Sequence, residues 1–198
     1  MSHPTLNITR LGLFALVAIS TSLAVAEPKQ GFSTMFGVLQ PVAFQGGNVA
    51  VTYTSGRWMY EYSHGVNLKL HKFQDSLTNE EKDEKMELTL PWTTGASVGY
   101  YLTDEIAIAI ELKAHRYEAR HPEGGEKSYT TYSVGPGLYY NKYFGDHFFI
   151  QPVLRFWPNV SSSEDSQKVK FQRTNGSVYE HKVHDFGLFL NLSVGYTF

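Results

Sequence analysis

Apolar and polar side chains alternate along much of the chain after residue 30. Between residues 86 and 102 the even positions are mostly apolar, whereas the odd positions are small or polar. The alternation resumes from residue 106 to 115 and again from residue 186 to 198. A period of two predicts β-strands with one apolar face, and no helical period of 3.6 competes with it in the last of these segments.

Eight strands are expected from this alternation. They lie near residues 31–40, 47–54, 57–68, 86–102, 106–116, 129–143, 148–158 and 185–198. Short turns near 55–56, 103–105 and 145–147 alternate with longer links, so an up-and-down order places the long links together at one end. The sequence therefore predicts an all-β fold, an eight-stranded antiparallel up-and-down barrel. The polar links 69–85 and 159–184 are expected to be solvated loops.

The N-terminal segment has the pattern of an export signal. Arg10 precedes the apolar run LGLFALVAI, and small residues end at Ala24-Val25-Ala26. Nine apolar residues are too few to cross about 30 Å of hydrocarbon as a helix. We therefore expect residues 1–26 to be a cleaved signal peptide and residues 27–198 to form the barrel domain.

The apolar face of such a barrel could point into a ligand cavity or outward into lipid. Strands of about ten residues are long enough to cross a bilayer, and aromatic residues gather toward the strand ends. One aromatic group, near the short turns, comprises Trp58, Tyr60, Tyr62, Tyr100, Tyr101, Tyr139, Tyr140, Tyr143, Phe144, Phe148, Tyr196 and Phe198. A second group, nearer the loops, comprises Trp92, Tyr132, Phe156 and Trp157. Both features favour a transmembrane barrel over the alternative, a soluble lipocalin-like binder.

The last strand carries a resemblance to a known family. Its sequence NLSVGYTF ends the printed chain on an aromatic residue, with apolar or aromatic residues at alternate positions. These positions are Leu190, Leu192, Val194, Tyr196 and Phe198. The strand looks like the C-terminal assembly signal of Gram-negative outer-membrane β-barrels, and the chain resembles the small eight-stranded family that includes outer membrane proteins A and X. The resemblance implies insertion by the barrel-insertion machinery, contact with outer-membrane lipid and lipopolysaccharide, periplasmic turns and cell-surface loops.

Charge and composition exclude some functions. Lys and Arg number 17 against 19 Asp and Glu, which gives a net charge of −2 with no basic tract, so nucleic acid is not an expected partner. The chain has no Cys, which removes disulfides, thiolate metal sites and cysteine nucleophiles.

The odd positions of the strands would face the barrel interior. They include five charged residues, Arg57, Glu61, Glu111, Lys113 and Arg155, together with His115, Gln151 and Asn191. Eight strands leave an interior just wide enough for side chains to fill, so we expect opposite charges to pair there as a structural network. This predicts a structural or surface-interaction role. The alternative is a narrow, porin-like channel or a transporter of small ligands.

Hydroxyl and histidine side chains are the candidates for a catalytic or metal site in this sequence. Ser63 and His64 are consecutive, so on a strand they point to opposite faces and cannot form a nucleophile–base pair without a bulge. Histidines 115, 121, 181 and 184, with Ser177 and Asp185, could converge above the barrel, but we expect solvated side chains. His181 and His184 are likewise expected to be exposed rather than to chelate a metal. We predict no catalytic residue, metal or cofactor, and a lipid A-modifying acyl hydrolase or acyltransferase is the enzymatic alternative.

The remaining expectations concern partners. We expect a monomer whose loops could contact an extracellular ligand that the sequence does not identify. The acidic run from residue 80 to 87 is usually a solvated face, and it could alternatively hold divalent cations that bridge lipopolysaccharide.

Overall fold

A computed structural model describes residues 26–73 and 76–198 of the chain. Apart from Ala26, the expected export signal lies outside the described residues. The first half contains β1 (Gly31–Gly37), α1 (Leu39–Phe44), β2 (Gly47–Ser55), β3 (Trp58–Lys69), η1 (Leu70–Lys72), α2 (Asn79–Asp83) and β4 (Glu87–Tyr101). The second half contains β5 (Ile106–His121), β6 (Gly125–Tyr140), β7 (Lys142–Phe144), β8 (Phe148–Trp157), β9 (Asn159–Ser162), η3 (Asp165–Gln167), β10 (Lys168–Gln172), β11 (Val178–Lys182) and β12 (Gly187–Thr197).

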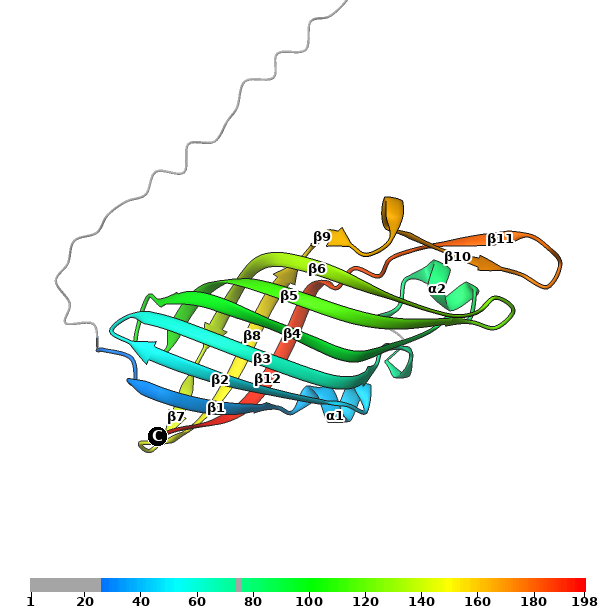
Figure 1. The fold of residues 1–198 in the computed structure, drawn as a ribbon. Helices are drawn as coiled ribbons and strands as arrows, with labels where there is room; N and C mark the ends of the chain where they lie inside the picture. The colour runs from blue at the N-terminus through cyan, green and yellow to red at the C-terminus, as the bar shows by residue number, and fades with distance from the viewer. Residues whose placement is uncertain (1–25, 74–75) are drawn as a thin grey trace, which may run out of the picture.

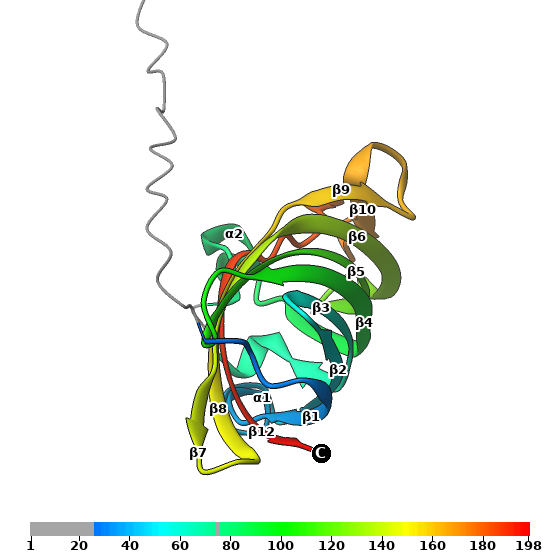
Figure 2. The same cartoon turned by 90° about the vertical axis from the view of Figure 1, so that its left-hand side faces the viewer.

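The strands form a closed antiparallel barrel (Figures 1 and 2). The order around the barrel is β8, β12, β1, β2, β3, β4, β5 and β6, and β6 pairs with β8 to close it. The first and last strands lie side by side, with Ser33 opposite Thr197. The prediction of eight strands in up-and-down order is confirmed. The segment expected as one strand over 129–143 is β6 followed by the short β7, and both pair with β8.

The apolar side chains point outward from the barrel. On β5, Ile108 and Ile110 are 47% and 57% exposed, whereas Ala107 and Glu111 are fully buried. The same alternation runs along β2, β3 and β8. This is the opposite of a soluble ligand-binding barrel, so the lipocalin-like alternative is contradicted.

One apolar stripe changes face in the middle of β4. Thr89 lies opposite Glu118 and Trp92 opposite Arg116, so β4 contains one residue more than β5 between these pairs. Such a bulge shifts the alternation by one position. We expected the even positions from residue 86 to 102 to share one face of the strand, and this is wrong for residues 86, 88 and 90. Met86, Leu88 and Leu90 point inward and are buried, while Val98 and Tyr100 point outward.

Three aromatic residues expected in the girdles also point inward. Tyr101, Tyr139 and Trp157 are at most 7% exposed. Trp58, Tyr60, Tyr140 and Phe148 do lie on the outer face. The described residues contain no helix that is long and apolar enough to cross a membrane.

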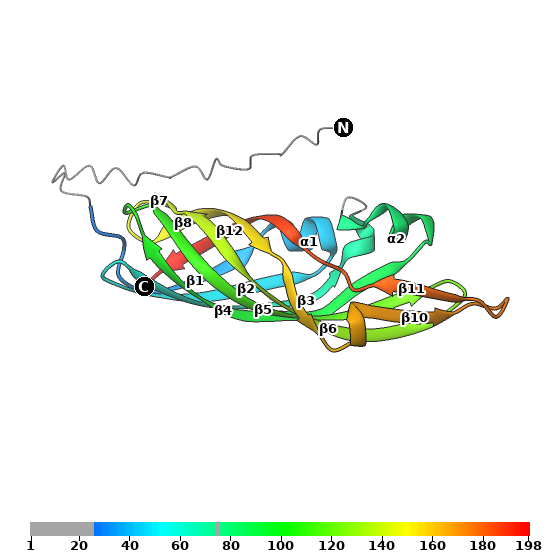
Figure 3. The ribbon, with the colours of Figure 1, turned by 90° about the horizontal axis from the view of Figure 1, so that it is seen from above.

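The long links form a packed layer at one end of the barrel, which we call the mouth core. It combines α2, the β10–β11 hairpin and the parts of β4, β5 and β6 that extend beyond the barrel (Figures 1 and 3). Its buried residues include Leu70, Leu77, Leu88, Tyr117 and Phe171. The expectation that 69–85 and 159–184 are only solvated loops is wrong, because their few apolar side chains meet those of the extended strands.

Candidate functional site: the charged lumen and the mouth core

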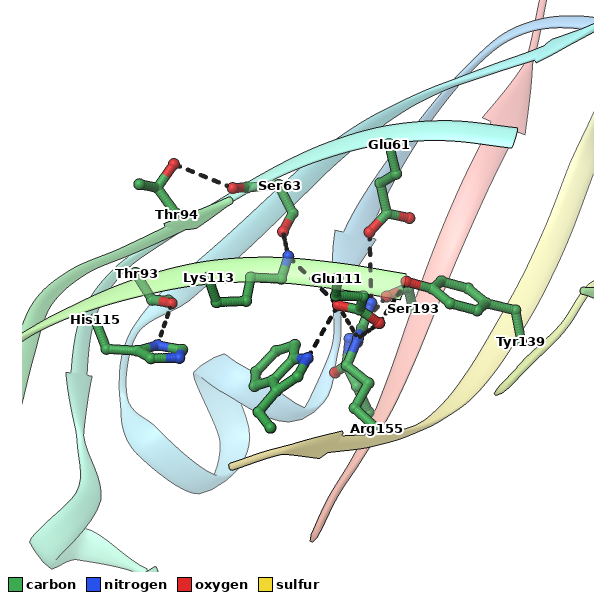
Figure 4. Close-up of polar contacts among 12 residues, drawn as sticks. Glu61, Ser63, Thr93, Thr94, Glu111, Lys113, His115, Tyr139, Arg155 and Ser193 are labelled. Carbon is green, nitrogen blue, oxygen red and sulfur yellow. Dashed lines mark hydrogen bonds and ion pairs between the residues drawn. The ribbon is translucent and has the colours of Figure 1, made fainter. Parts of the chain in front are cut away.

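Four of the five charged residues expected in the lumen converge on one cluster (Figure 4). Glu61, Glu111, Lys113 and Arg155 come from β3, β5 and β8, and their side chains are at most 7% exposed. They point inward because each occupies an odd position of a strand whose even positions carry the apolar outer face. Two acidic and two basic groups leave the cluster without net charge.

Glu111 is the central acceptor of the cluster. Its carboxylate accepts a hydrogen bond from Arg155 Nε at 3.0 Å, one from the Tyr139 hydroxyl at 2.6 Å and one from Trp157 Nε1 at 3.2 Å. Lys113 Nζ lies 3.6 Å from the same carboxylate and donates to Ser63 Oγ.

Glu61 is held more loosely. Its carboxylate lies 3.5 Å from Arg155 Nη2, and neither of its oxygens has a hydrogen-bond partner in the described part of the chain. The Arg155 guanidinium also lies 5.3 Å from the ring centres of both Tyr139 and Trp157. Arg155 therefore compensates two carboxylates and stacks on two aromatic rings.

Arg57 does not join this cluster, so its placement there is wrong. It lies in the turn between β2 and β3, directly after Gly56, whose φ is +57°. Its guanidinium donates to the backbone oxygens of Tyr101 and Leu102 at the rim. The other polar residues expected inside are buried there. His115 contacts Thr93 Oγ1 at 2.7 Å, Gln151 donates to Asn141, and Asn191 accepts from Gln40.

Sequence reasoning missed Tyr139 and Trp157 as members of the cluster. Both occupy odd positions of strands whose even neighbours face outward, so the period of two would have placed them inside. Their aromatic residue type alone favours a girdle position, whereas their odd position in the strand predicts the interior.

The lumen is filled on both sides of the cluster. The cavity beside it has a volume of 30 Å³, roughly the space of one water. Toward the short turns, Met59, Tyr101 and Val153 pack together. Toward the loops, the rings of Trp157, Phe186 and Phe189 contact one another, with Trp157 stacked on Phe189 and Phe186 edge-on to both. In the described part of the chain, the interior thus holds the charge pairs between two layers of packed side chains.

A second polar cluster lies in the mouth core. Glu81 on α2 is held by a capping box with Thr78, and its Oε1 lies 3.1 Å from His184 Nδ1 and 3.8 Å from His181 Nε2. His181 and His184 are 2% and 4% exposed, so the expectation of exposed histidines is wrong. Within residues 26–73 and 76–198, no three His, Asp or Glu side chains are arranged to hold a metal ion.

The environment of these groups shifts their pKa values. Burial raises the pKa of Glu81, but the hydrogen bond with His184, the charge of that ring and the Thr78 amide outweigh it, and the net pKa is lowered. Burial lowers the pKa of His181. Glu84 accepts hydrogen bonds from His121 and Arg173, and both lower its pKa. Glu81 and Glu84 of the acidic run are thus paired with side chains of the same chain.

The hydroxyl groups of Ser63 and Ser177 are hydrogen-bonded to side chains other than histidine. Ser63 is buried and accepts from Lys113, while His64 Nδ1 has no hydrogen-bond partner among the described residues. Ser177 lies at the exposed tip of the β10–β11 hairpin and bonds to Asn175. Neither serine hydroxyl is hydrogen-bonded to a histidine.

The residues of the C-terminal motif lie on the outer face of β12. Leu190, Val194 and Phe198 are 61%, 44% and 72% exposed, and Leu192 and Tyr196 are half-buried. The Tyr196 ring contacts those of Phe148 and Phe198.

The fold and its interior define a class: a closed eight-stranded antiparallel β-barrel with an apolar exterior and a charged, filled lumen. No family model matches the chain, and no curated protein matches it either. Among solved structures, the chain is similar to the N-terminal β-barrel domain of OprF from Pseudomonas aeruginosa, with 14% identity and a TM-score of 0.39. The match covers 85% of this chain and 98% of that domain. The barrel assignment itself rests on the strand pairings of this chain.

Proposed function

We propose that this chain is an outer-membrane β-barrel with a structural or surface-interaction role. The observation that carries the proposal is the inversion of the barrel, with apolar side chains outside and paired charges inside. Contact between this apolar exterior and water is unfavourable, whereas contact between it and the hydrocarbon of a lipid bilayer is favourable. The proposal includes export through the signal in residues 1–26 and insertion by the barrel-insertion machinery, for which the outward residues of β12 are the recognition element.

The filled lumen supports a barrel that does not conduct. The purified full-length protein, reconstituted in planar lipid bilayers, is expected to give no reproducible single-channel steps, because ion pairs and aromatic rings occupy the interior. Reproducible steps of one size would contradict this and favour the narrow-channel alternative.

The mouth core supports a surface role, because it is the larger ordered feature outside the barrel. We place it at the cell surface, in contact with lipopolysaccharide, with the short turns in the periplasm, and we propose that the chain acts as a monomer and not as an enzyme. An extracellular ligand, if it has one, would meet the β10–β11 hairpin.

The orientation can be tested with two matched insertions of one epitope tag. Residues Gly176 and Gly145 both lie in exposed turns with positive φ, at opposite ends of the barrel. Antibody added to intact cells is expected to label the tag after Gly176 and not the tag after Gly145, and both tags should be labelled after the cells are opened. The reverse pattern would overturn the orientation. Absence from the outer-membrane fraction would overturn the location.

A further inference from the structure

An open cleft lies at the loop end of the barrel, between α1 and the start of β12. Its volume is about 670 Å³, which is within the range of small-molecule sites. The first wall is α1, the second is formed by Phe73 and residues 76–78, and the third is the chain from His184 to Leu190. Figure 3 shows α1 beside the first part of β12.

The cleft is continuous with the outward apolar face of the barrel. Leu188 and Leu190 line the cleft and are also the most exposed residues of β12 before its C-terminal end, at 69% and 61%. Leu39, Val42 and Ala43 of α1 face them across the cleft. The cleft therefore opens where the outer apolar surface of the barrel ends and the mouth core begins.

The polar groups of the cleft lie on its side away from the barrel wall. His184 and Asp185 precede the part of β12 that enters the barrel, and Ser76 and Thr78 belong to the link that leads into α2. The His184 ring is fixed by the contact of its Nδ1 with Glu81. The polar residues of the lining thus belong to the segments that precede β12 and α2.

The residue types that line the cleft indicate which class of ligand it can bind. The described lining residues include no Lys or Arg, the side chains that most often bind phosphate and other anions, and the sequence LQPVAF of α1 carries no charge. We propose that the cleft binds one acyl chain of a lipid from the surrounding leaflet, with the polar end of that lipid beside His184. The inference rests on the proposed membrane location.

The test uses the full-length protein in phosphatidylcholine vesicles that contain a small fraction of a phospholipid with a photoreactive acyl chain. After irradiation, labelled residues are mapped by mass spectrometry. We expect labels on α1 and on Leu77, which lie outside the barrel wall, in addition to labels on the outer face of the strands. Labels on the outer face alone would overturn the inference and leave the membrane location intact.

Three variants test whether the labels on α1 and Leu77 come from a lipid bound in the cleft. Ala43→Phe fills the cleft, and Val42→Asp places a carboxylate at a position that is 83% exposed, so that folding is little affected. Both are expected to lower labelling of α1 and Leu77 several-fold without changing labelling of the outer face. Ala96→Phe makes the same substitution on the exposed face of β4, outside the cleft, and should leave cleft labelling unchanged. Equal labelling of the cleft in all three variants would overturn the inference. No labelling of either region would overturn the membrane location, and the inference with it.

Discussion

At the level of single residues, one arginine in the lumen forms ion pairs with both buried carboxylates. Arg155 contacts both Glu61 and Glu111, and no other described cation makes an ion pair with both. Lys113 pairs with Glu111 alone. Breaking a buried ion pair on one side leaves an uncompensated charge, which costs more than the pair itself contributes.

Replacing Arg155 by alanine is therefore expected to destabilise the barrel by about 3–5 kcal/mol. The free energy of unfolding can be measured by urea titration of the protein in lipid vesicles. Arg57→Ala is the matched control, because Arg57 bonds only to backbone oxygens at the half-buried rim and its loss should cost about 1 kcal/mol. Equal losses in the two variants would contradict the assignment of Arg155 to a central role.

The sequence predicts which side chains face the lumen only where the residue lies in a regular strand, because the prediction uses its odd or even position. Glu61, Glu111, Lys113 and Arg155 were placed in the lumen by the period of two, which holds wherever a strand is regular. Arg57 was misplaced because it lies in a turn, where alternation has no meaning. The distances among the four charges could not be predicted, since they depend on how β3, β5 and β8 face one another across the barrel.

At the level of secondary-structure elements, the bulge in β4 could not be predicted from the alternation of apolar and polar residues. The alternation from Met86 to Leu102 is unbroken in the sequence, yet one extra residue beside Pro91 turns the apolar side chains from the core to the exterior. A bulge of this kind conserves the pattern while exchanging the faces.

The two halves of β4 should therefore respond differently to the same substitution. Val98→Lys places a charge on the outer face of the barrel, where it is expected to cost about 2–4 kcal/mol at mid-membrane depth. Leu88→Lys buries a charge in the mouth core, so the barrel should still insert while residues 159–184 become sensitive to protease. Insertion is read from membrane fractionation, and sensitivity from limited proteolysis. A loss of insertion with Leu88→Lys and not with Val98→Lys would contradict the assigned faces.

The mouth core should also loosen at low pH. The lowered pKa of His181 means that the unfolded segment binds a proton below about pH 6.5 while the folded one does not, so stability falls as the pH drops through that range. The lowered pKa of Glu81 contributes stability above about pH 4.5, and it is lost as the pH falls through the folded pKa. Glu80, Glu81 and His184 act electrostatically on His181.

Amide hydrogen exchange of the β10–β11 hairpin measures this loosening. Exchange is expected to accelerate between pH 7.5 and pH 5, after correction for the intrinsic rate, while exchange of β8 stays constant. His181→Gln should reduce the acceleration. A hairpin whose corrected protection is the same at both pH values would contradict the role of these buried groups.

At the scale of the whole molecule, the barrel could be predicted and the mouth core could not. The eight strands are regular, local in sequence and joined by recognisable turns, so their number and order follow from the alternation. The mouth core depends on contacts between distant links, such as that of Glu81 with His184, which are 103 positions apart. Sparse apolar residues in polar links carry no periodic signal that would reveal such packing.

In this protein the apolar exterior of a closed barrel is proposed to face lipid. The electrophoretic mobility of boiled and unboiled samples from the outer-membrane fraction tests this. A detergent-resistant barrel is expected to migrate differently before and after boiling, and the shift should be found in the detergent-extracted fraction. A protein that is recovered without detergent and shows no shift would contradict the account.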